Sequence, residues 1–277
     1  MPPWREARLR RVWGGGIFVR LFERILSEGL RQPDSPLQTL MLGWHASAVV
    51  LEDGRCGLGA VPLPGQEVLR STPRFPRHLV EGTAHEVLQL LVSPYPQEFA
   101  AASAVASALL PPEEPGESLE TLAPLPEGDQ VALLGYDHEL VPRLRRWGWH
   151  LIIFDDLRPG VDVLPSWTEA PLLRGTPWVW VAFDALRDRR MLALAPLLRE
   201  HRGAVLQGPG VPWHPPLLRE LGFSHLVLPT WTGENFPAIL THISAGGNPW
   251  HCAALEWRCF SLHHDPSVLF FPEESSC

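Results

Sequence analysis

The spacing of apolar residues predicts a mixed first part of the chain. The predicted elements are a helix over 18–30, strands over 40–51 and 56–61, and helices over 83–91 and 97–110. Asp53-Gly54 favours a hairpin between the two strands, and Thr83 with Glu86 forms the capping box that opens a helix. The Ala-rich composition of the last helix allows close packing. This combination indicates an α+β unit with helices on one face of a sheet.

The second part alternates short apolar runs with helical patterns. Strands are predicted over 131–135, 151–155, 178–182, 204–207 and 225–228, and helices over 139–147, 188–201, 217–221 and 235–244. Continuous apolar strands of this kind indicate a parallel sheet covered on both faces. Right-handed crossovers bring the carboxyl ends of such strands to one edge, where α/β sheets bind ligands. We therefore expect Gly135, Asp155, Ala182, Gly208 and Pro229 to meet there.

A Pro-, Glu- and Gly-rich stretch between the two parts lacks periodicity. It predicts an α+β domain over 1–115, a linker over 116–128, and an α/β domain over 129–277 with an irregular C-terminal tail. The length of 277 residues and the hydrophobic content of 45% allow a sizeable core.

Charge and composition exclude several classes of function. The net charge of −8 gives no basic footprint for nucleic acid, and no apolar run reaches the roughly 20 residues of a membrane span. Because the N-terminal arginines precede no signal-like apolar run, we expect a soluble, cytoplasmic protein. All 23 basic residues are Arg. The absence of Lys excludes a pyridoxal phosphate Schiff base, a lysine base and a P-loop lysine.

The loop from Gly208 to Pro215 joins a predicted strand to a predicted helix. Free N–H groups at such a turn can hold an anion or a polar ligand edge, and we expect Gly208, Pro209 and Gly210 to contact the ligand. The alternative is that Gly and Pro only shape a tight connection. His214 in this loop is a candidate general acid or base and a candidate metal ligand, unless backbone groups satisfy it. Arg55 is the first-domain candidate for an anion contact.

Nucleotide binding is half supported by the first two strands of the second part. Asp155 follows Gly135 by 20 residues and could accept hydrogen bonds from a ribose. The sequence around Gly135 is not G-x-G-x-x-G, however, and Tyr136 and Asp137 would obstruct a pyrophosphate. The alternative for Asp155 is turn chemistry at a strand end.

Metal binding is the second chemistry that the residues allow. The candidate ligands, besides His214, are His251, Cys252, Cys259 and His263. Their spacing matches no common closed site, and the alternative is buried cysteines with surface histidines. Trp213, Trp231 and Trp250 could wall a planar ligand or pack at a domain interface.

These motifs together resemble a known family. The Gly208–Pro215 loop, the Ala-rich helix, Val131–Tyr136 and Phe154–Gly160 are similar to the "putative heavy-metal chelation" family over residues 15–250. The resemblance implies an enolase N-terminal-like domain joined to a Rossmann-like domain, with a site between them. Three positions depart from the family pattern: Ser107 stands in place of Asn, Asp155 in place of Glu, and 183–188 in place of a loop with Thr and Asn.

The expected function is binding of an anionic, nucleotide-like or metal-complexed small molecule in the interdomain cleft, by a binding protein or an enzyme of metal-related metabolism. The alternatives are a metal carrier or sensor that uses the C-terminal His and Cys, and a scaffold that has lost activity. A transition metal is the candidate cofactor, and the Trp content is compatible with a homodimer.

Overall fold

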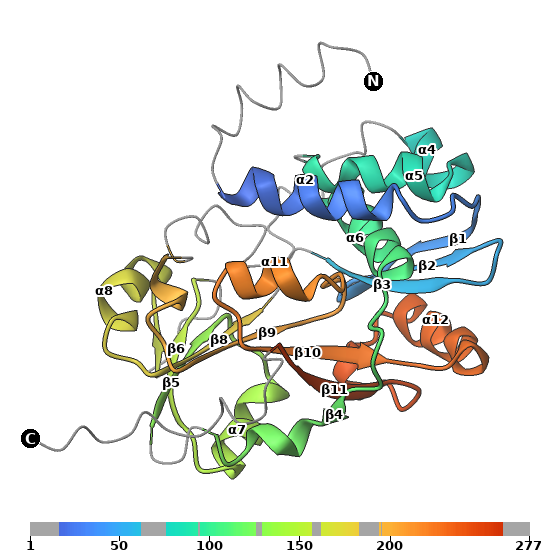
Figure 1. Ribbon diagram of the computed structural model, residues 1–277. Coiled ribbons are helices and arrows are strands. Elements are labelled where there is room, and N and C mark those ends of the chain that lie inside the picture. The colour runs from blue at the N-terminus through green and yellow to red at the C-terminus, as the bar shows by residue number, and fades with distance from the viewer. Residues whose placement is uncertain are drawn as a thin grey trace, which may run out of the picture.

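The computed structural model describes residues 17–61, 76–93, 95–125, 129–156, 162–182, 194 and 196–262. These residues form two sheets with helices around each (Figure 1). The architecture is the predicted α/β class, with a small antiparallel sheet and a larger, mostly parallel one. Within the described residues, no helix is long and apolar enough to cross a membrane.

The small sheet contains three antiparallel strands in sequence order. They are β1 (Leu37–Leu42), β2 (Ala46–Leu51) and β3 (Cys56–Ala60). The single strand predicted over 40–51 is wrong, because the chain turns back at Gly43, whose N–H donates to the Ala46 carbonyl at 3.0 Å. A Cβ at Gly43 would lie 2.6 Å from Cγ2 of Ile243. The turn at Gly43 lies against α12 (Phe236–Ser244), and the mostly apolar sequence around it gives no signal for a turn.

Helices cover one face of the small sheet (Figure 1). They are α2 (Ile17–Gly29), α4 (Pro76–Glu81), α5 (Ala84–Leu88), the 3₁₀ turn η1 (Gln89–Val92) and α6 (Pro96–Leu109). The Ala-rich α6 packs against β3 at backbone distance: a Cβ added at Gly57 would lie 2.1 Å from the Ala104 carbonyl oxygen. Small residues on both elements permit this approach, as the composition of the helix predicted.

The large sheet contains eight strands in the order β4-β11-β10-β9-β8-β5-β6-β7. They are β4 (Glu117–Ser118), β5 (Gln130–Leu134), β6 (His150–Phe154), β7 (Val163–Leu164), β8 (Trp178–Ala182), β9 (Gly203–Gln207), β10 (His225–Thr230) and β11 (Glu256–Ser261). The six neighbouring strands β10-β9-β8-β5-β6-β7 are parallel to one another. Strand β11 is antiparallel to both β10 and β4. All five predicted parallel strands are present.

The strand order reverses beside β5, which pairs with β6 on one side and with β8 on the other. The chain passes from β5 to β6 and β7, and then crosses to β8. Such a reversal is the topological switch point, where the loops that leave the carboxyl ends of adjacent strands diverge and open a crevice. The β5–β8 edge is therefore the favoured ligand position in this sheet.

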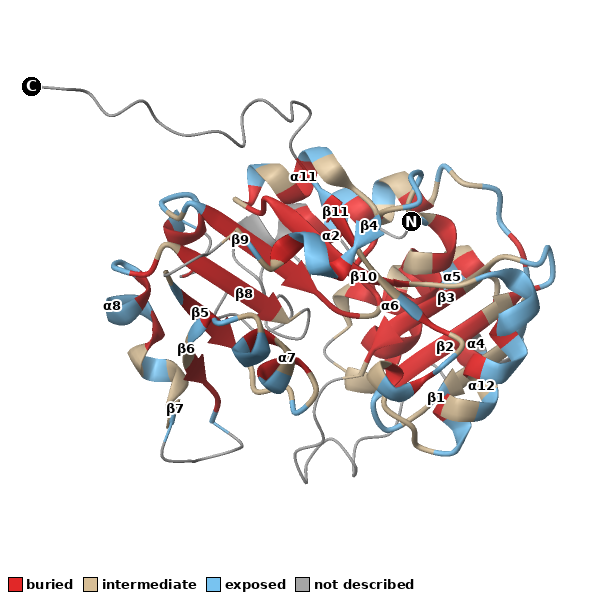
Figure 2. Cartoon of the chain, turned by 90° about the horizontal axis from the view of Figure 1, so that it is seen from below, coloured by how far each residue is buried: buried red, intermediate tan, exposed pale blue. Residues whose placement is uncertain are grey.

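Helices and 3₁₀ turns connect the strands of the large sheet. They are η2 (Leu119–Leu122), α7 (Leu140–Arg146), η3 (Ser166–Thr168), α8 (Glu169–Leu173), α11 (Pro215–Glu220), η4 (Gly233–Asn235), α12 (Phe236–Ser244) and η5 (Pro249–His251). Ala132 and Leu134 of β5 share a core cluster with Leu217 of α11. Leu133, also of β5, belongs to a second cluster together with Leu144 of α7. The sheet is therefore buried on both faces (Figure 2). Most of the predicted 188–201 helix lies outside the described residues.

The two sheets are joined by a shared hydrophobic cluster. Ala48 of β2 and Leu58 of β3 pack with Phe236, Ile239 and Ile243 of α12, which covers the second face of the small sheet. The predicted linker contributes β4 to the large sheet, and the tail expected to be irregular contains β11. The segments on either side of the proposed boundary thus pack into the same body.

Candidate functional site

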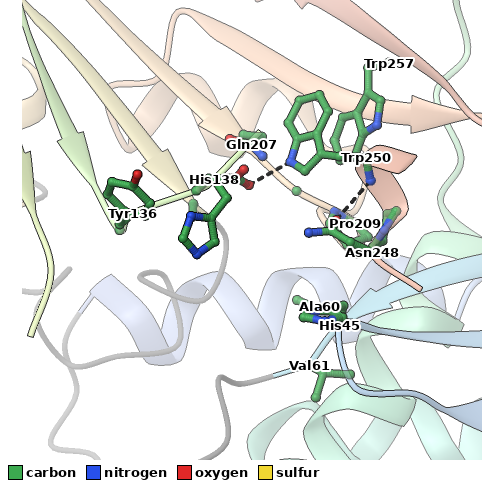
Figure 3. Close-up of a pocket in the computed structure, with 15 residues that line it drawn as sticks. His45, Ala60, Val61, Tyr136, His138, Gln207, Pro209, Asn248, Trp250 and Trp257 are labelled. Atoms are coloured by element: carbon green, nitrogen blue, oxygen red, sulfur yellow. Dashed lines mark hydrogen bonds between the residues drawn. The ribbon is translucent and has the colours of Figure 1, made fainter. Parts of the chain in front are cut away.

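A pocket of about 200 Å³ opens at the switch point, between the two sheets (Figure 3). His45, Ala60 and Val61 line it from the small-sheet side. The large-sheet side contributes Gly135 to His138, Ala182, Gln207 to Pro209, Asn248 to Trp250, and Trp257. The sheet-edge argument therefore placed Gly135, Ala182 and Gly208 correctly around one pocket, at the ends of three adjacent strands. Asp155 and Pro229, which were expected there as well, are not among the lining residues.

The loop after β5 forms one wall of the pocket, and a hydrogen bond to Asp155 holds it in place. Gly135 has a φ of +99°, which favours glycine, and its N–H donates to the Phe154 carbonyl at 2.8 Å. The Tyr136 N–H donates to Oδ2 of Asp155 at 2.8 Å. Asp155 is buried and is not part of the pocket lining. The carboxylate expected to contact a ligand thus shapes the loop that carries Tyr136.

Asp137 fixes a second wall, which is aromatic. Its Oδ1 accepts the N–H groups of Glu139 and Leu140 at 2.8 and 3.0 Å, and its Oδ2 accepts Nε1–H of Trp250 at 2.7 Å. The Trp250 ring stacks on Trp257 with centroids 3.8 Å apart and planes 19° apart. The dashed lines in Figure 3 include the Asp137–Trp250 bond. Through these bonds Asp137 holds the wall in place, and its negative charge remains part of the pocket lining.

The Gly208–Pro215 loop contributes Gly208 and Pro209 to the pocket, and its next residue joins the two sheets. Gly210 has a φ of +82°, and a Cβ there would lie 2.7 Å from the Ala60 nitrogen and 2.8 Å from Cα of Gly59. Backbone therefore meets backbone at this point. Gly210 serves the junction and is not among the lining residues.

His214 ends the same loop and caps α11. Its Nδ1 accepts the Leu217 N–H at 3.4 Å. The first two helical residues are Pro215 and Pro216, which have no N–H to offer an anion. His214 is absent from the pocket lining. Its position therefore supports the backbone-satisfied alternative, and not the acid–base or metal-ligand roles expected for it.

Arg55 also lies away from the pocket, in the hairpin between β2 and β3. Its guanidinium donates to the Asp53 carboxylate at 2.5 Å and to the Pro33 carbonyl at 2.6 Å. This hydrogen bond from Arg55 holds the pKa of Asp53 below its usual value. The anion contact expected of Arg55 is replaced by a local ion pair.

Comparison with known proteins gives two matches along the chain. Two family models with the description "putative heavy-metal chelation" match residues 23–110 and 117–257. The chain belongs to this family. No curated protein matches the sequence. Crystal structures of two family members of unknown function share the fold.

The two structural relatives come from two different organisms. The protein from Pyrococcus horikoshii is 14% identical, with a TM-score of 0.69 over 88% of this chain and 99% of that one. The protein from Desulfitobacterium hafniense is 16% identical, with a TM-score of 0.68 over 90% of this chain and 100% of that one. At these identities the comparison shows a common fold, and the chemistry must come from the residues of this chain.

The family description makes metal ligands the first chemistry to test. Cys252 packs in the cluster under α12, whereas Cys259 lies in a different cluster under α7. Burial raises the pKa of Cys259 to about 12, and Nε2 of His251 lies 2.7 Å from Oε1 of Glu139. His263 lies outside the described residues. No three His, Cys, Asp or Glu side chains among the described residues form a group that could hold a metal ion.

The pocket of this family member contains functional groups that the sequence reasoning did not select. They are His45, His138, Gln207, Asn248 and Trp257. His45 lies in the turn that was predicted as strand, so its position was hidden. Gln207 carried a usable signal, because it is a polar residue that ends an apolar strand immediately before Gly208.

The described lining of the pocket contains no permanently cationic side chain. No Arg is among the described lining residues, and the protein contains no Lys. Its polar side chains are the imidazoles of His45 and His138, two amides, the Tyr136 hydroxyl and the engaged Asp137 carboxylate. Neither imidazole has a hydrogen-bond partner among the described residues, and both are exposed. They are the groups that can bind a metal or exchange a proton there.

Proposed function

We propose that the protein binds a small polar ligand in this pocket, and that a transition metal ion already held by a small chelator is the first candidate. The observation that carries the proposal is the exposure of two imidazoles, His45 and His138, in a pocket at the switch point; neither has a hydrogen-bond partner among the described residues. Imidazole suits Zn, Cu, Fe and Ni. The family description supports a ligand of metal metabolism.

A chelated ion fits the residues better than a bare ion does. A closed protein site for a metal such as Zn²⁺ takes four ligands, and the described residues form no group of even three. An ion whose coordination shell is mostly filled by a chelator needs only one added ligand, which His45 or His138 can supply. The protein would then recognise the complex, not assemble the whole coordination shell.

The pocket gives less support to the anionic and nucleotide-like ligands. A phosphate would find no arginine among the lining residues that the structure describes. Asp155, the candidate ribose contact, is engaged by the Tyr136 N–H.

Isothermal titration calorimetry tests the proposal with Ni²⁺ and Zn²⁺, each as the free ion and as the complex with citrate or histidine. The variants are His45→Ala and His138→Ala, with His150→Ala as the matched control. His150 is exposed at the start of β6, at the opposite edge of the parallel sheet. We expect a complex to bind the wild type and the control equally, and to bind at least one pocket variant tenfold more weakly.

The alternatives give different results. Binding of the free ions alone, unchanged in all three variants, would indicate adventitious surface sites and reject the proposal. Binding that survives both pocket variants but is lost in Cys252→Ser or His251→Ala would favour the carrier or sensor that uses the C-terminal residues. No binding of any complex would reject a chelate as the ligand.

A further inference from the structure

The floor of the pocket holds an amide whose donor is unused. Gln207 is the last residue of β9 and is 5% exposed. It lines the pocket together with Ala182, its parallel partner at the end of β8. A glutamine buried to this degree in a strand of Ala, Val and Leu costs free energy unless its polar atoms are satisfied. The carbonyl oxygen and the NH₂ group of Gln207 therefore each require a hydrogen-bond partner.

The orientation of this amide is fixed by Trp180 on the neighbouring strand β8. The indole Nε1–H of Trp180 donates to Oε1 of Gln207 at 2.6 Å. Trp180 is fully buried, and an indole nitrogen can only donate. The carbonyl end of the amide must therefore face Trp180, and the NH₂ end must face away from it. The positions of Oε1 and Nε2 of Gln207 are thus assigned by the hydrogen bond, because only an oxygen can accept from the indole.

The NH₂ group of Gln207 has no hydrogen-bond acceptor among the residues that the structure describes. The described side-chain nitrogens that are wholly buried and unpaired belong to Trp178, His201 and Trp257, so the Gln207 nitrogen keeps accessible surface. The pocket is where that surface lies, since Gln207 is a lining residue (Figure 3). This donor is ready for an acceptor on a ligand.

The surroundings define what such an acceptor belongs to. The aromatic wall of Trp250 and Trp257 favours a planar molecule. No arginine is among the described lining residues, and the Asp137 carboxylate keeps its negative charge because only neutral N–H groups donate to it. The described lining therefore gives no compensation for a negative charge on the ligand. A carbonyl oxygen or a ring nitrogen on a neutral heterocycle satisfies the Gln207 donor without such compensation.

We propose that Gln207 is a specificity-determining residue of this pocket, and that the organic part of the ligand is an uncharged planar heterocycle bearing a carbonyl oxygen or ring nitrogen. The inference rests on the proposed function only in using the same pocket. It concerns the organic molecule, and it makes no use of the pocket imidazoles. The two proposals can therefore fail separately.

The test uses metal-free probes, so that it is independent of metal binding. Picolinamide, hypoxanthine and uracil are the uncharged heterocycles, and picolinate and orotate are the anionic counterparts. Dissociation constants are measured by ligand-observed NMR for the wild type, Gln207→Glu and Gln130→Glu at pH 8. Gln207→Glu keeps an oxygen for the Trp180 N–H but replaces the donor by an acceptor. Gln130 is exposed at the start of β5, so Gln130→Glu matches the change in charge away from the pocket.

We expect at least one uncharged heterocycle to bind the wild type and Gln130→Glu equally, and to bind Gln207→Glu at least tenfold more weakly, because two acceptors then face each other. The matching anion should bind the wild type more weakly than its uncharged counterpart. Should Gln207→Glu fail to fold, Gln207→Met removes the same donor without a charge, with an expected loss of roughly 2- to 12-fold.

Three results would overturn the inference: equal binding by Gln207→Glu and Gln130→Glu, tighter binding of the anions, or no binding of any heterocycle to the wild type. If the heterocycles bind in a Gln207-dependent manner while no metal complex binds, this inference stands and the chelate proposal fails. If complexes bind through His45 or His138 while the heterocycles do not bind, the chelate proposal stands and this inference fails.

Discussion

The contact of Gly210 with the small sheet allows a quantitative test of how the two sheets are joined. Gly210→Ala adds one methyl group at a position with a φ of +82°. An L-residue in the left-handed region costs about 1–2 kcal/mol. The added Cβ would also lie 2.7 Å from the Ala60 nitrogen and 2.8 Å from Cα of Gly59, so the backbone of β3 has to move. Overpacking of this kind costs about 1–3 kcal/mol more.

A matched control separates these two contributions. Gly148 has a φ of +83°, and no atom lies within 4 Å of the Cβ that alanine would add there. Gly148→Ala should therefore lose only the conformational contribution of about 1–2 kcal/mol. The difference between the two variants, about 1–3 kcal/mol, is the cost of parting the loop from the small sheet.

Equilibrium unfolding in urea, followed by far-UV circular dichroism, measures both free energies of unfolding. In a thermal scan the same difference corresponds to about 2–12 °C between the two melting temperatures. Equal losses in Gly210→Ala and Gly148→Ala would refute the reasoning, because they would mean that the loop and β3 are not in backbone contact. A larger loss in Gly148→Ala would refute it as well.

Three further predictions concern residues outside the pocket. His214→Ala should cost about 0.5–1 kcal/mol through loss of the cap to Leu217, while the affinity for pocket ligands, measured by calorimetry, stays unchanged. Cys259 should resist iodoacetamide at pH 8 until urea unfolds the protein, as mass spectrometry can show, because its raised pKa of about 12 leaves roughly 1 in 10,000 thiols ionised. The Asp53–Arg55 pair stabilises the fold above the ordinary Asp pKa of 3.8, and this contribution is lost as the pH falls through the lowered pKa of the folded state. Arg55→Ala should therefore lower stability at pH 6, by at most about 1 kcal/mol for so exposed a pair, and have less effect at pH 2.

The strands that could be predicted from the sequence are those whose burial leaves a local trace. The runs ending at Leu134, Phe154 and Ala182 are apolar on both faces, and the structure buries both faces. The two-residue strands β4 and β7 have no periodicity to detect, because they are defined by their partners. The β1–β2 turn was missed because Trp44 and His45 extend a mostly apolar run while remaining exposed.

The position of the site could be predicted from the sequence, but the side chains that are available to a ligand there could not. Strand ends and glycines locate the pocket, because parallel topology alone brings them to one edge. Which side chains are available depends on hydrogen bonds that form only in the folded protein. Asp155 and His214 have suitable chemistry in the sequence, but the N–H groups of Tyr136 and Leu217 occupy them.

The hydrogen bonds formed in the folded protein also explain why we infer the ligand preference of this pocket from Gln207 and not from a charged residue. Asp137 lies on the rim with a full charge, yet its oxygens are used by three protein donors. Gln207 is neutral, but Trp180 satisfies only its carbonyl and leaves the amide donor open to the pocket. A binding site selects its ligand through groups that the fold orients but leaves unsatisfied, because those groups gain most when a complementary atom arrives.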